Sequence, residues 1–112
     1  MTMTFGMMLF LLVVGHALAD YPLQTTFMAQ AKNRHTELGQ QYWTHVLPAH
    51  AIIHGGFVAV ITGQVWLGIA ETVIHGVTDW AKCEKKISLN TDQAIHLLCK
   101  LAWAILAFFV LK

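Results

Sequence analysis

The sequence predicts an all-α protein: an integral membrane bundle of about four short transmembrane helices, with an amphipathic interfacial segment after the first. Hydrophobic residues make up 56% of the 112 residues and charged residues 12%, and the mean hydropathy is +0.55. A soluble chain this short buries too little of its surface to hide so many apolar side chains. Ionisable residues inside the apolar segments also recur four apart, close to the helical period. We therefore expect residues 1–112 to form one membrane domain.

The first transmembrane span is expected at about residues 5–20, where the run from Met7 to Ala19 is almost wholly apolar. The same run could be a secretory signal peptide, because Ala17-Leu18-Ala19 fits the small-residue rule for cleavage. No lysine or arginine precedes Met7, however, and cleavage would remove His16. We interpret the segment as a membrane helix.

Residues 21–41 are the most polar part of the chain. Glutamines, an asparagine and charged side chains alternate there with Phe27 and Met28, as in an amphipathic segment that lies on a membrane surface. We expect this segment to be helical from about Leu23 to Asn33 and to connect the first two spans.

The second span is expected at about residues 43–61. It opens with Tyr42 and Trp43, which are typical of side chains that anchor a helix at the membrane–water interface. Pro48 lies inside the span, and a proline there removes a backbone hydrogen bond. We predict a kink or a restart of the helix near His50.

The third span is expected at about residues 65–80, after the short turn Thr62-Gly63-Gln64. A polar loop then leads to a fourth span at about residues 91–111, for which Asn90 or Thr91 could provide the N-cap. These spans are shorter than the roughly 20 residues that usually cross a bilayer. Tilt or local thinning of the membrane would make up the difference.

The distribution of basic residues predicts the orientation in the membrane. If the spans alternate in direction, the opposite side carries only the amino terminus and Lys112. Loops rich in lysine and arginine face the cytoplasm, so both termini should lie outside it. The residues expected at the cytoplasmic side are Lys32, Arg34, Lys82, Lys85 and Lys86.

Each apolar segment carries ionisable side chains four residues apart, which places them on one face of a helix. With alternating spans, all these faces come to the same depth near the cytoplasmic surface. A single His–Asp pair could be only a cap or an interfacial hydrogen bond, but charges inside a membrane are costly, and several of them indicate mutual compensation or a bound ion. The residues are His16 and Asp20, His50 and His54, Glu71, His75 and Asp79, and Asp92 and His96.

Imidazoles and carboxylates are the ligands that zinc, iron and manganese use in proteins. The candidates outnumber the four ligands of a tetrahedral zinc, so we expect one or two divalent ions (Zn, Mn or Fe). Glu71 or Asp92 could then act as a general base. Lys32 and Lys82 could hold an anionic head group, although interfacial lysines also follow from the charge rule alone. The expected metal ligands are His16, Asp20, His50, His54, His75, Asp79 and His96.

Other classes of site are disfavoured. A formal charge of +1 gives no basic patch for nucleic acid. Cys83 and Cys99 lack the spacing of a disulfide framework or a zinc ribbon. Haem could use axial histidines, but the adjacent carboxylates would then have no purpose.

The motifs also resemble those of a family of unknown function, made up of small integral membrane proteins found in bacteria, phages and prophages. The resemblance implies a membrane location, here the inner membrane of a bacterium or phage host, and a shared role for the matching residues, but no established activity. It covers nearly the whole chain. The matches are H-x3-D followed by an aromatic residue and L-Q (His16, Asp20, Tyr21, Leu23, Gln24), then Met28 and Lys32, His50 and His54, E-x3-H-x3-D-x2-K (Glu71, His75, Asp79, Lys82) and D-Q-x2-H (Asp92, Gln93, His96).

Several functions follow from this pattern. The first is a metal-dependent hydrolase of a lipid or lipid-linked phosphoester near the cytoplasmic face. The second is a non-enzymatic phage or prophage protein that acts on the host envelope, for example by superinfection exclusion, with a structural polar network. The third is transfer of protons or ions. The expected partners are the bilayer, a lipid-linked substrate or a host membrane protein, and self-association is open.

Overall fold

The computed structural model describes residues 3–111, and helices account for most of them. No strand occurs in this part of the chain, so the predicted all-α class is confirmed. Lys112, which we expected on the far side of the membrane, lies outside the described residues. The elements are α1 (Phe5–Asp20), α2 (Thr26–Ala31), α3 (Glu37–Thr62), α4 (Val65–Cys83), α5 (Leu89–Ile105) and a π-helical turn, η1 (Leu106–Val110).

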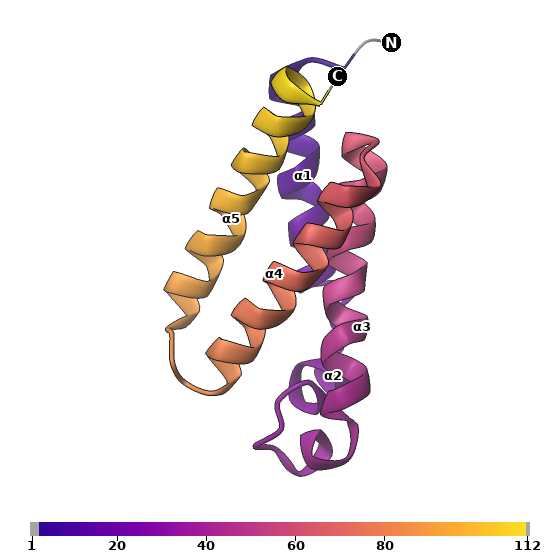
Figure 1. The fold of residues 1–112 in the computed structure, drawn as a ribbon. Coiled ribbons are helices and arrows are strands. Elements are labelled where there is room, and N and C mark those ends of the chain that lie inside the picture. The colour runs from indigo at the N-terminus through magenta and orange to yellow at the C-terminus, as the bar shows by residue number, and fades with distance from the viewer. Residues whose placement is uncertain (1–2, 112) are drawn as a thin grey trace.

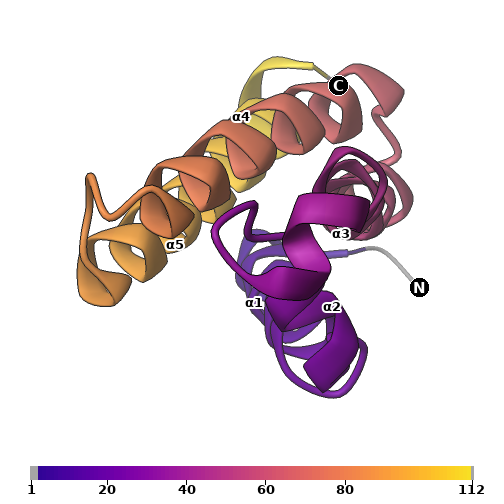
Figure 2. The same cartoon turned by 90° about the horizontal axis from the view of Figure 1, so that it is seen from below.

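The molecule is elongated, with extents of 47 × 22 × 22 Å, and its long helices run up and down (Figure 1). The start of α1 lies beside the end of η1, where Phe5 packs against Phe108 and Phe109. The turn between α3 and α4 is at the same end. The α4–α5 loop and α2 lie at the opposite end, and α2 packs against α3 (Figure 2).

Hydroxyl side chains fix where the helices begin. Thr4, Thr25, Thr36 and Ser88 each accept a hydrogen bond from the backbone N–H three residues later, which satisfies a free donor of the first turn. The predicted caps of the last helix were therefore wrong: Ser88, ahead of both Asn90 and Thr91, is the N-cap. At the other end of α3, Gly63 adopts a left-handed conformation with φ of 70° and stops the helix.

Helix α3 is longer than the expected second span. It begins at Glu37 because Thr36 caps it, and it continues through Pro48 without a restart. Pro48 is exposed, so the carbonyl group that it leaves without a helical donor belongs to an outward-facing part of the helix. Within the polar segment before α3, helix is confined to Thr26–Ala31, less than the Leu23–Asn33 that we expected.

Helices α3 and α4 make a close backbone contact at two glycines. A Cβ atom added to Gly55 would lie 2.5 Å from the carbonyl oxygen of Gly68, and one added to Gly68 would lie 2.7 Å from that of Gly55. Real side chains do not approach backbone so closely. The absence of side chains at these positions therefore sets the spacing of α3 and α4.

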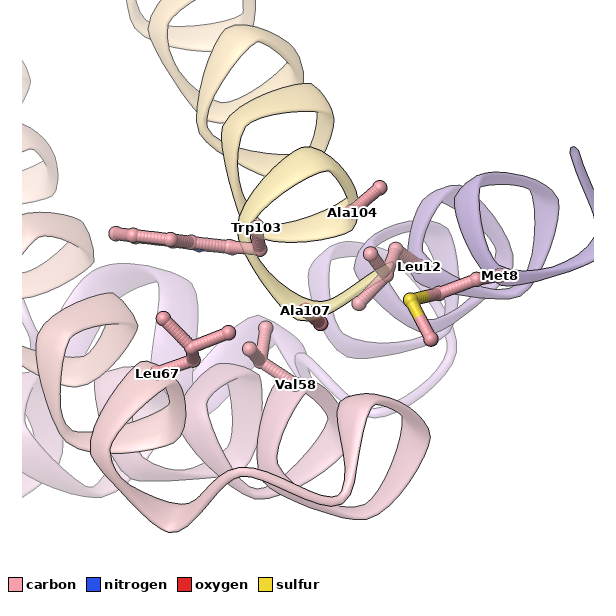
Figure 3. Close-up of a cluster of buried hydrophobic side chains, with 7 residues drawn as sticks. All are labelled: Met8, Leu12, Val58, Leu67, Trp103, Ala104 and Ala107. Atoms are coloured by element: carbon pink, nitrogen blue, oxygen red, sulfur yellow. The ribbon is translucent and has the colours of Figure 1, made fainter. Parts of the chain in front are cut away.

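Buried apolar side chains form a small cluster near the end that holds the start of α1 and the end of η1 (Figure 3). Elsewhere the usual distribution is reversed, because many ionisable side chains are inside while large apolar ones face outward, such as Val60 at 83% and Trp66 at 74% exposure. The cluster consists of Met8, Leu12, Val58, Leu67, Trp103, Ala104 and Ala107.

Two of the described helices are long and apolar enough to cross a membrane, Glu37–Thr62 and Leu89–Val110. Phe5–Asp20 is apolar but shorter. Helix α4 is not in this group and carries Glu71, Asp79 and Lys82. Core helices of soluble proteins and signal sequences share these properties, so length and composition identify possible spans without fixing their number or orientation.

Candidate metal centre

Asp20, the last residue of α1, joins α1 to α3. Its Oδ1 atom is 2.8 Å from Nε2 of His54 and 3.2 Å from Nε2 of His50. These two histidines are one helical turn apart and present both rings to the same carboxylate. His50 and His54 have exposures of 0% and 1%, so the contact lies inside the protein.

His75 lies on α4, and its ring contacts imidazoles of α3 and of α5. It stacks on His54, with ring centroids 3.6 Å apart, and on His96, with centroids 4.0 Å apart. His50 meets the same ring edge-on at 5.1 Å. Imidazoles from three helices thus form one buried stack next to Asp20.

The first possible metal-binding set consists of Asp20, His50, His54 and His75. Each offers one ligand atom, and these atoms all lie within 4.8 Å of one another. The Nδ1 atoms of His50, His54 and His75 are buried without a hydrogen-bond partner, and Nε2 of His50 makes no hydrogen bond although it lies 3.2 Å from Asp20 Oδ1. Buried polar atoms are normally paired, so unpaired imidazole nitrogens grouped in this way are what a bound metal ion would satisfy.

The second possible set consists of Glu71, His75 and His96, under the same distance limit. It shares His75 with the first set, and a neutral imidazole has only one nitrogen free to coordinate. Glu71 is also engaged by its surroundings: its Oε1 accepts hydrogen bonds from Nζ of Lys100 and, at 3.1 Å, from Nε1 of Trp103. The second set therefore differs from the first, because its only carboxylate is already hydrogen-bonded and one of its histidines is shared.

Lys100 is a site residue that the sequence analysis missed. It is 1% exposed and forms the ion pair with Glu71 across α4 and α5. The signal was present, because Asp92, His96 and Lys100 continue the four-residue spacing by one step. The antiparallel helices then pair His96 with His75 and Lys100 with Glu71. The surrounding apolar run concealed this lysine.

Asp79 is in neither set, although we predicted it as a metal ligand. Its Oδ2 accepts a hydrogen bond from Nζ of Lys32 at 2.7 Å, and its Oδ1 is 3.1 Å from Nζ of Lys82. Nε2 of His50 is 3.7 Å from the same Oδ2 atom. Two lysines thus neutralise Asp79, which makes it a neighbour of the centre.

The two lysines expected to hold a head group both have partners inside the protein. Lys32 is 5% exposed and faces Asp79, not the surface. Lys82 is 25% exposed and lies between Asp79 and Asp92, 3.8 Å from Oδ2 of the latter. An anion-binding role for Lys32 and Lys82 stays a prediction, and Lys82 is the more accessible of the two.

Gln93 connects the remaining predicted residues. Its Nε2 donates to Oδ2 of Asp20 and to Oδ2 of Asp92, each at 3.1 Å. Its Oε1 is 3.0 Å from Nε2 of His16, which also lies 3.4 Å from Oδ2 of Asp20. Asp92 in turn is 3.1 Å from Nε2 of His96. Contacts of this kind orient metal ligands in known sites, so His16, Gln93 and Asp92 surround the centre.

A pocket of about 120 Å³ opens beside the centre at the end that carries α2. Asp20, Lys82 and Gln93 lie in its wall, so a small polar molecule that enters it would meet the carboxylate shared by His50 and His54. Towards the opposite end lies the buried apolar cluster of Figure 3, which includes Trp103. The other lining residues are Tyr21, Gln24 and Leu89.

A separate ion-pair cluster lies in the loops at the end of the molecule that carries α2. Arg34 hydrogen-bonds both carboxylate oxygens of Glu84, at 2.5 and 2.8 Å, and Nε2 of His35 is 2.7 Å from Oε2. The Arg34 hydrogen bonds, with a smaller effect from His35, lower the pKa of Glu84 to about 2. The cluster ties the loop before α3 to the end of α4.

The structure thus brings the sequence-predicted residues of four helices into one buried cluster. Asp20, His50, His54, His75, His96 and Glu71 fall in the two possible metal-binding sets, whereas His16, Asp79, Asp92, Lys32 and Lys82 surround them. The roles proposed for them as ligands, bases or anion-binding groups remain predictions.

Comparison with known proteins identifies the family of the chain but no activity. A family model described as "Protein of unknown function (DUF3307)" matches residues 8–111. The resemblance to a family of unknown function is therefore confirmed, while the individual motifs and a bacterial or phage origin stay predictions. No curated protein matches, and no solved structure matches.

Proposed function

Because the chain belongs to the DUF3307 family of proteins of unknown function, its role has to be inferred from its own site, and we propose that it is an integral membrane protein that binds a divalent metal ion. The proposed ligands are Asp20, His50, His54 and His75. The observation that carries the proposal is that their ligand atoms lie within 4.8 Å of one another, buried, with imidazole nitrogens left unpaired. Three imidazoles and one carboxylate suit zinc, manganese or iron.

The reversed distribution of side chains supports the membrane part of the proposal. In water, exposed apolar side chains such as Val60, Trp66 and Phe10 would be unfavourable when so many gather on one small protein. In lipid they are the expected surface, and the polar groups belong inside. We propose that α1, α3, α4 and α5 span a bacterial inner membrane, with the end that carries Arg34, Lys85 and Lys86 in the cytoplasm.

Hydrolysis of a lipid or lipid-linked phosphoester is the reaction that we propose for this centre. A bound metal ion lowers the pKa of coordinated water and polarises a phosphoryl oxygen. The pocket beside Asp20 provides an approach from the basic end, and Lys82 in its wall could hold the substrate phosphate. Of the two proposed bases, Asp92 is favoured, because it contacts two pocket residues, Lys82 and Gln93, whereas Glu71 is occupied by Lys100 and Trp103.

A metal-free structural network is the second candidate. The ion pairs Lys32–Asp79 and Lys100–Glu71 favour it, because they neutralise buried charges without any ion. The protein would then act through its membrane surface, as a non-enzymatic envelope protein. Transfer of protons across the membrane has less support, because apolar side chains fill the bundle beyond Trp103.

The test is the metal content of the protein purified in mild detergent without chelator, measured by elemental mass spectrometry. His54→Ala and His75→Ala each remove a ligand and should lose most of the bound metal. His45→Ala is the matched control, because His45 is on α3 but exposed. We expect about one equivalent in the wild type and in the control. Metal at background level in the folded wild type would overturn the proposal in favour of the structural network.

Asp92→Asn then separates metal binding from chemistry. If Asp92 is the base, the variant should keep its metal and lose hydrolysis of a lipid phosphoester in mixed micelles. A variant that retains both the metal and full activity would remove Asp92 from the proposed role.

A further inference from the structure

A positively charged side chain already lies against the second possible metal-binding set. Nζ of Lys100 hydrogen-bonds Oε1 of Glu71, the only carboxylate of that set. Lys100 and Glu71 are 1% and 0% exposed, so water does not screen the pair. The ammonium group supplies the positive charge that a buried carboxylate requires.

A divalent ion at Glu71 would meet two obstacles. Its charge would be repelled by the ammonium group, which is held against the same carboxylate in an interior of low effective dielectric constant. Trp103 fixes that carboxylate from a further side, through a hydrogen bond of 3.1 Å to the same oxygen. The other oxygen, Oε2, is buried without a hydrogen-bond partner, so an ion coordinated there would share its carboxylate with the Lys100 ammonium group and be repelled by it.

The first set has no comparable obstacle. Asp20 is contacted by imidazoles and by the Gln93 carboxamide, which are neutral groups or potential ligands. Lys32 and Lys82, the lysines at this end of the cluster, form their ion pairs with Asp79. Since His75 can coordinate only one ion at a time, the first set is favoured to use it.

We propose that the protein holds a single metal ion, at Asp20, His50, His54 and His75, and that Lys100 takes the place of a second ion at Glu71. This inference rests on the proposed metal-binding function and gives it a stoichiometry. It follows that removal of the Lys100 charge opens Glu71 and His96 to a second metal ion, while His75 stays with the first.

The experiment compares zinc stoichiometry in variants at this position. Purified protein is stripped with chelator, loaded with excess Zn²⁺, desalted and analysed by elemental mass spectrometry. Lys100→Met removes the charge at similar length, and Lys100→Gln keeps a group that can hydrogen-bond Glu71 while removing the charge. Lys86→Met is the matched control, because Lys86 is exposed in the α4–α5 loop. The double variant Lys100→Met/His96→Ala removes a ligand that belongs only to the second set.

We expect one equivalent of zinc in the wild type and in Lys86→Met, two in Lys100→Met or Lys100→Gln, and one again in the double variant. Two equivalents in the wild type would overturn the inference, because the second set would then bind despite Lys100. One equivalent in folded Lys100→Met and Lys100→Gln would also overturn it while leaving the proposed function intact. Zero equivalents in all of them would overturn the proposed function itself.

Discussion

His54 on α3 stacks on His75 on α4 with ring centroids 3.6 Å apart and ring planes 20° apart. The contact lies where the backbones of the two helices approach each other closely. The close approach comes from Gly55, next to His54 in the chain, whose Cα faces the carbonyl oxygen of Gly68. The geometry of the proposed centre therefore depends on positions that carry no side chain.

Gly55→Ala is expected to destabilise the protein by about 1–3 kcal/mol, the usual cost of forcing an extra group into a packed interface. The new Cβ would lie 2.5 Å from the Gly68 carbonyl oxygen, and the helices would have to separate. Gly56→Ala is the matched control, since a Cβ there meets nothing within 4 Å. Alanine favours helix, so Gly56→Ala should be neutral or slightly stabilising. Thermal unfolding in detergent checks both, and equal midpoints would contradict the argument.

Replacement of Glu71 by glutamine is expected to cost about 3–5 kcal/mol in metal-free protein, because it leaves the Lys100 ammonium buried without a countercharge. Glu71→Gln/Lys100→Met, which removes both charges, should recover much of that loss. Glu37→Gln is a control at an exposed acidic residue and should change stability by less than about 1 kcal/mol. Unfolding in a denaturing detergent with chelator present measures the series. A double variant as unstable as Glu71→Gln would show that the ion pair is not the cause.

Metal removal provides a third prediction. An ion that binds only the folded state stabilises it by about 2.7 kcal/mol at a concentration 100-fold above its Kd. Chelator should therefore lower the unfolding temperature of the wild type and of His45→Ala. His54→Ala, which lacks a proposed ligand, should respond little. An equal response of all three proteins would place the metal effect outside the proposed set.

The sequence predicted the long helices and the faces that meet, because both depend on local periodicity. His50 and His54, for example, must share a face wherever the helix packs. Hydroxyl caps such as Ser88 were harder to select, since Asn90 and Thr91 nearby are also good N-cap residues. Pro48 was expected to kink the helix or restart it near His50, and the helix continues through it without a restart.

The parts that could not be predicted depend on which distant residues meet. The pairing of Lys32 with Asp79 requires the segment after α1 to turn back onto α4, and nothing local in either segment specifies that. The expected alternation of helix direction brought the histidines to one level of the bundle but did not predict their partition into two sets. We propose that Lys100, a single charge in an apolar run, decides which of the two sets holds an ion.

The ion-pair cluster of Arg34, His35 and Glu84 predicts that the stability of the fold depends on pH. The pKa of Glu84 is lowered from its ordinary value of 4.5 to about 2 in the folded protein. A lowered carboxyl pKa means that ionised Glu84 stabilises the fold above about pH 4.5, and that this contribution is lost as the pH falls towards 2. Glu84→Gln should therefore be less stable than wild type near pH 6, and the two should converge as the pH approaches 2. Unfolding midpoints over that range check this, and a constant difference would contradict it.

The membrane orientation can be tested with single cysteines in a background in which Cys83 and Cys99 are replaced by serine and alanine. Lys86→Cys lies in the α4–α5 loop at the basic end, and Gln64→Cys lies at the α3–α4 turn. A membrane-impermeant maleimide should label Gln64→Cys from the periplasmic side and Lys86→Cys only in inverted vesicles, because basic loops face the cytoplasm. The reverse pattern would invert the topology.

Val73→Cys distinguishes a lipid-facing surface from a water-facing one. Val73 is 60% exposed on α4, so a thiol there is open to whatever surrounds the helix. In a bilayer that environment is hydrocarbon, where the thiolate needed for reaction does not form and a charged reagent does not enter. We expect no labelling from either side of the membrane and full labelling after denaturation. Labelling from either side in folded protein would mean that this face of α4 is in water, which would remove α4 from the proposed spans.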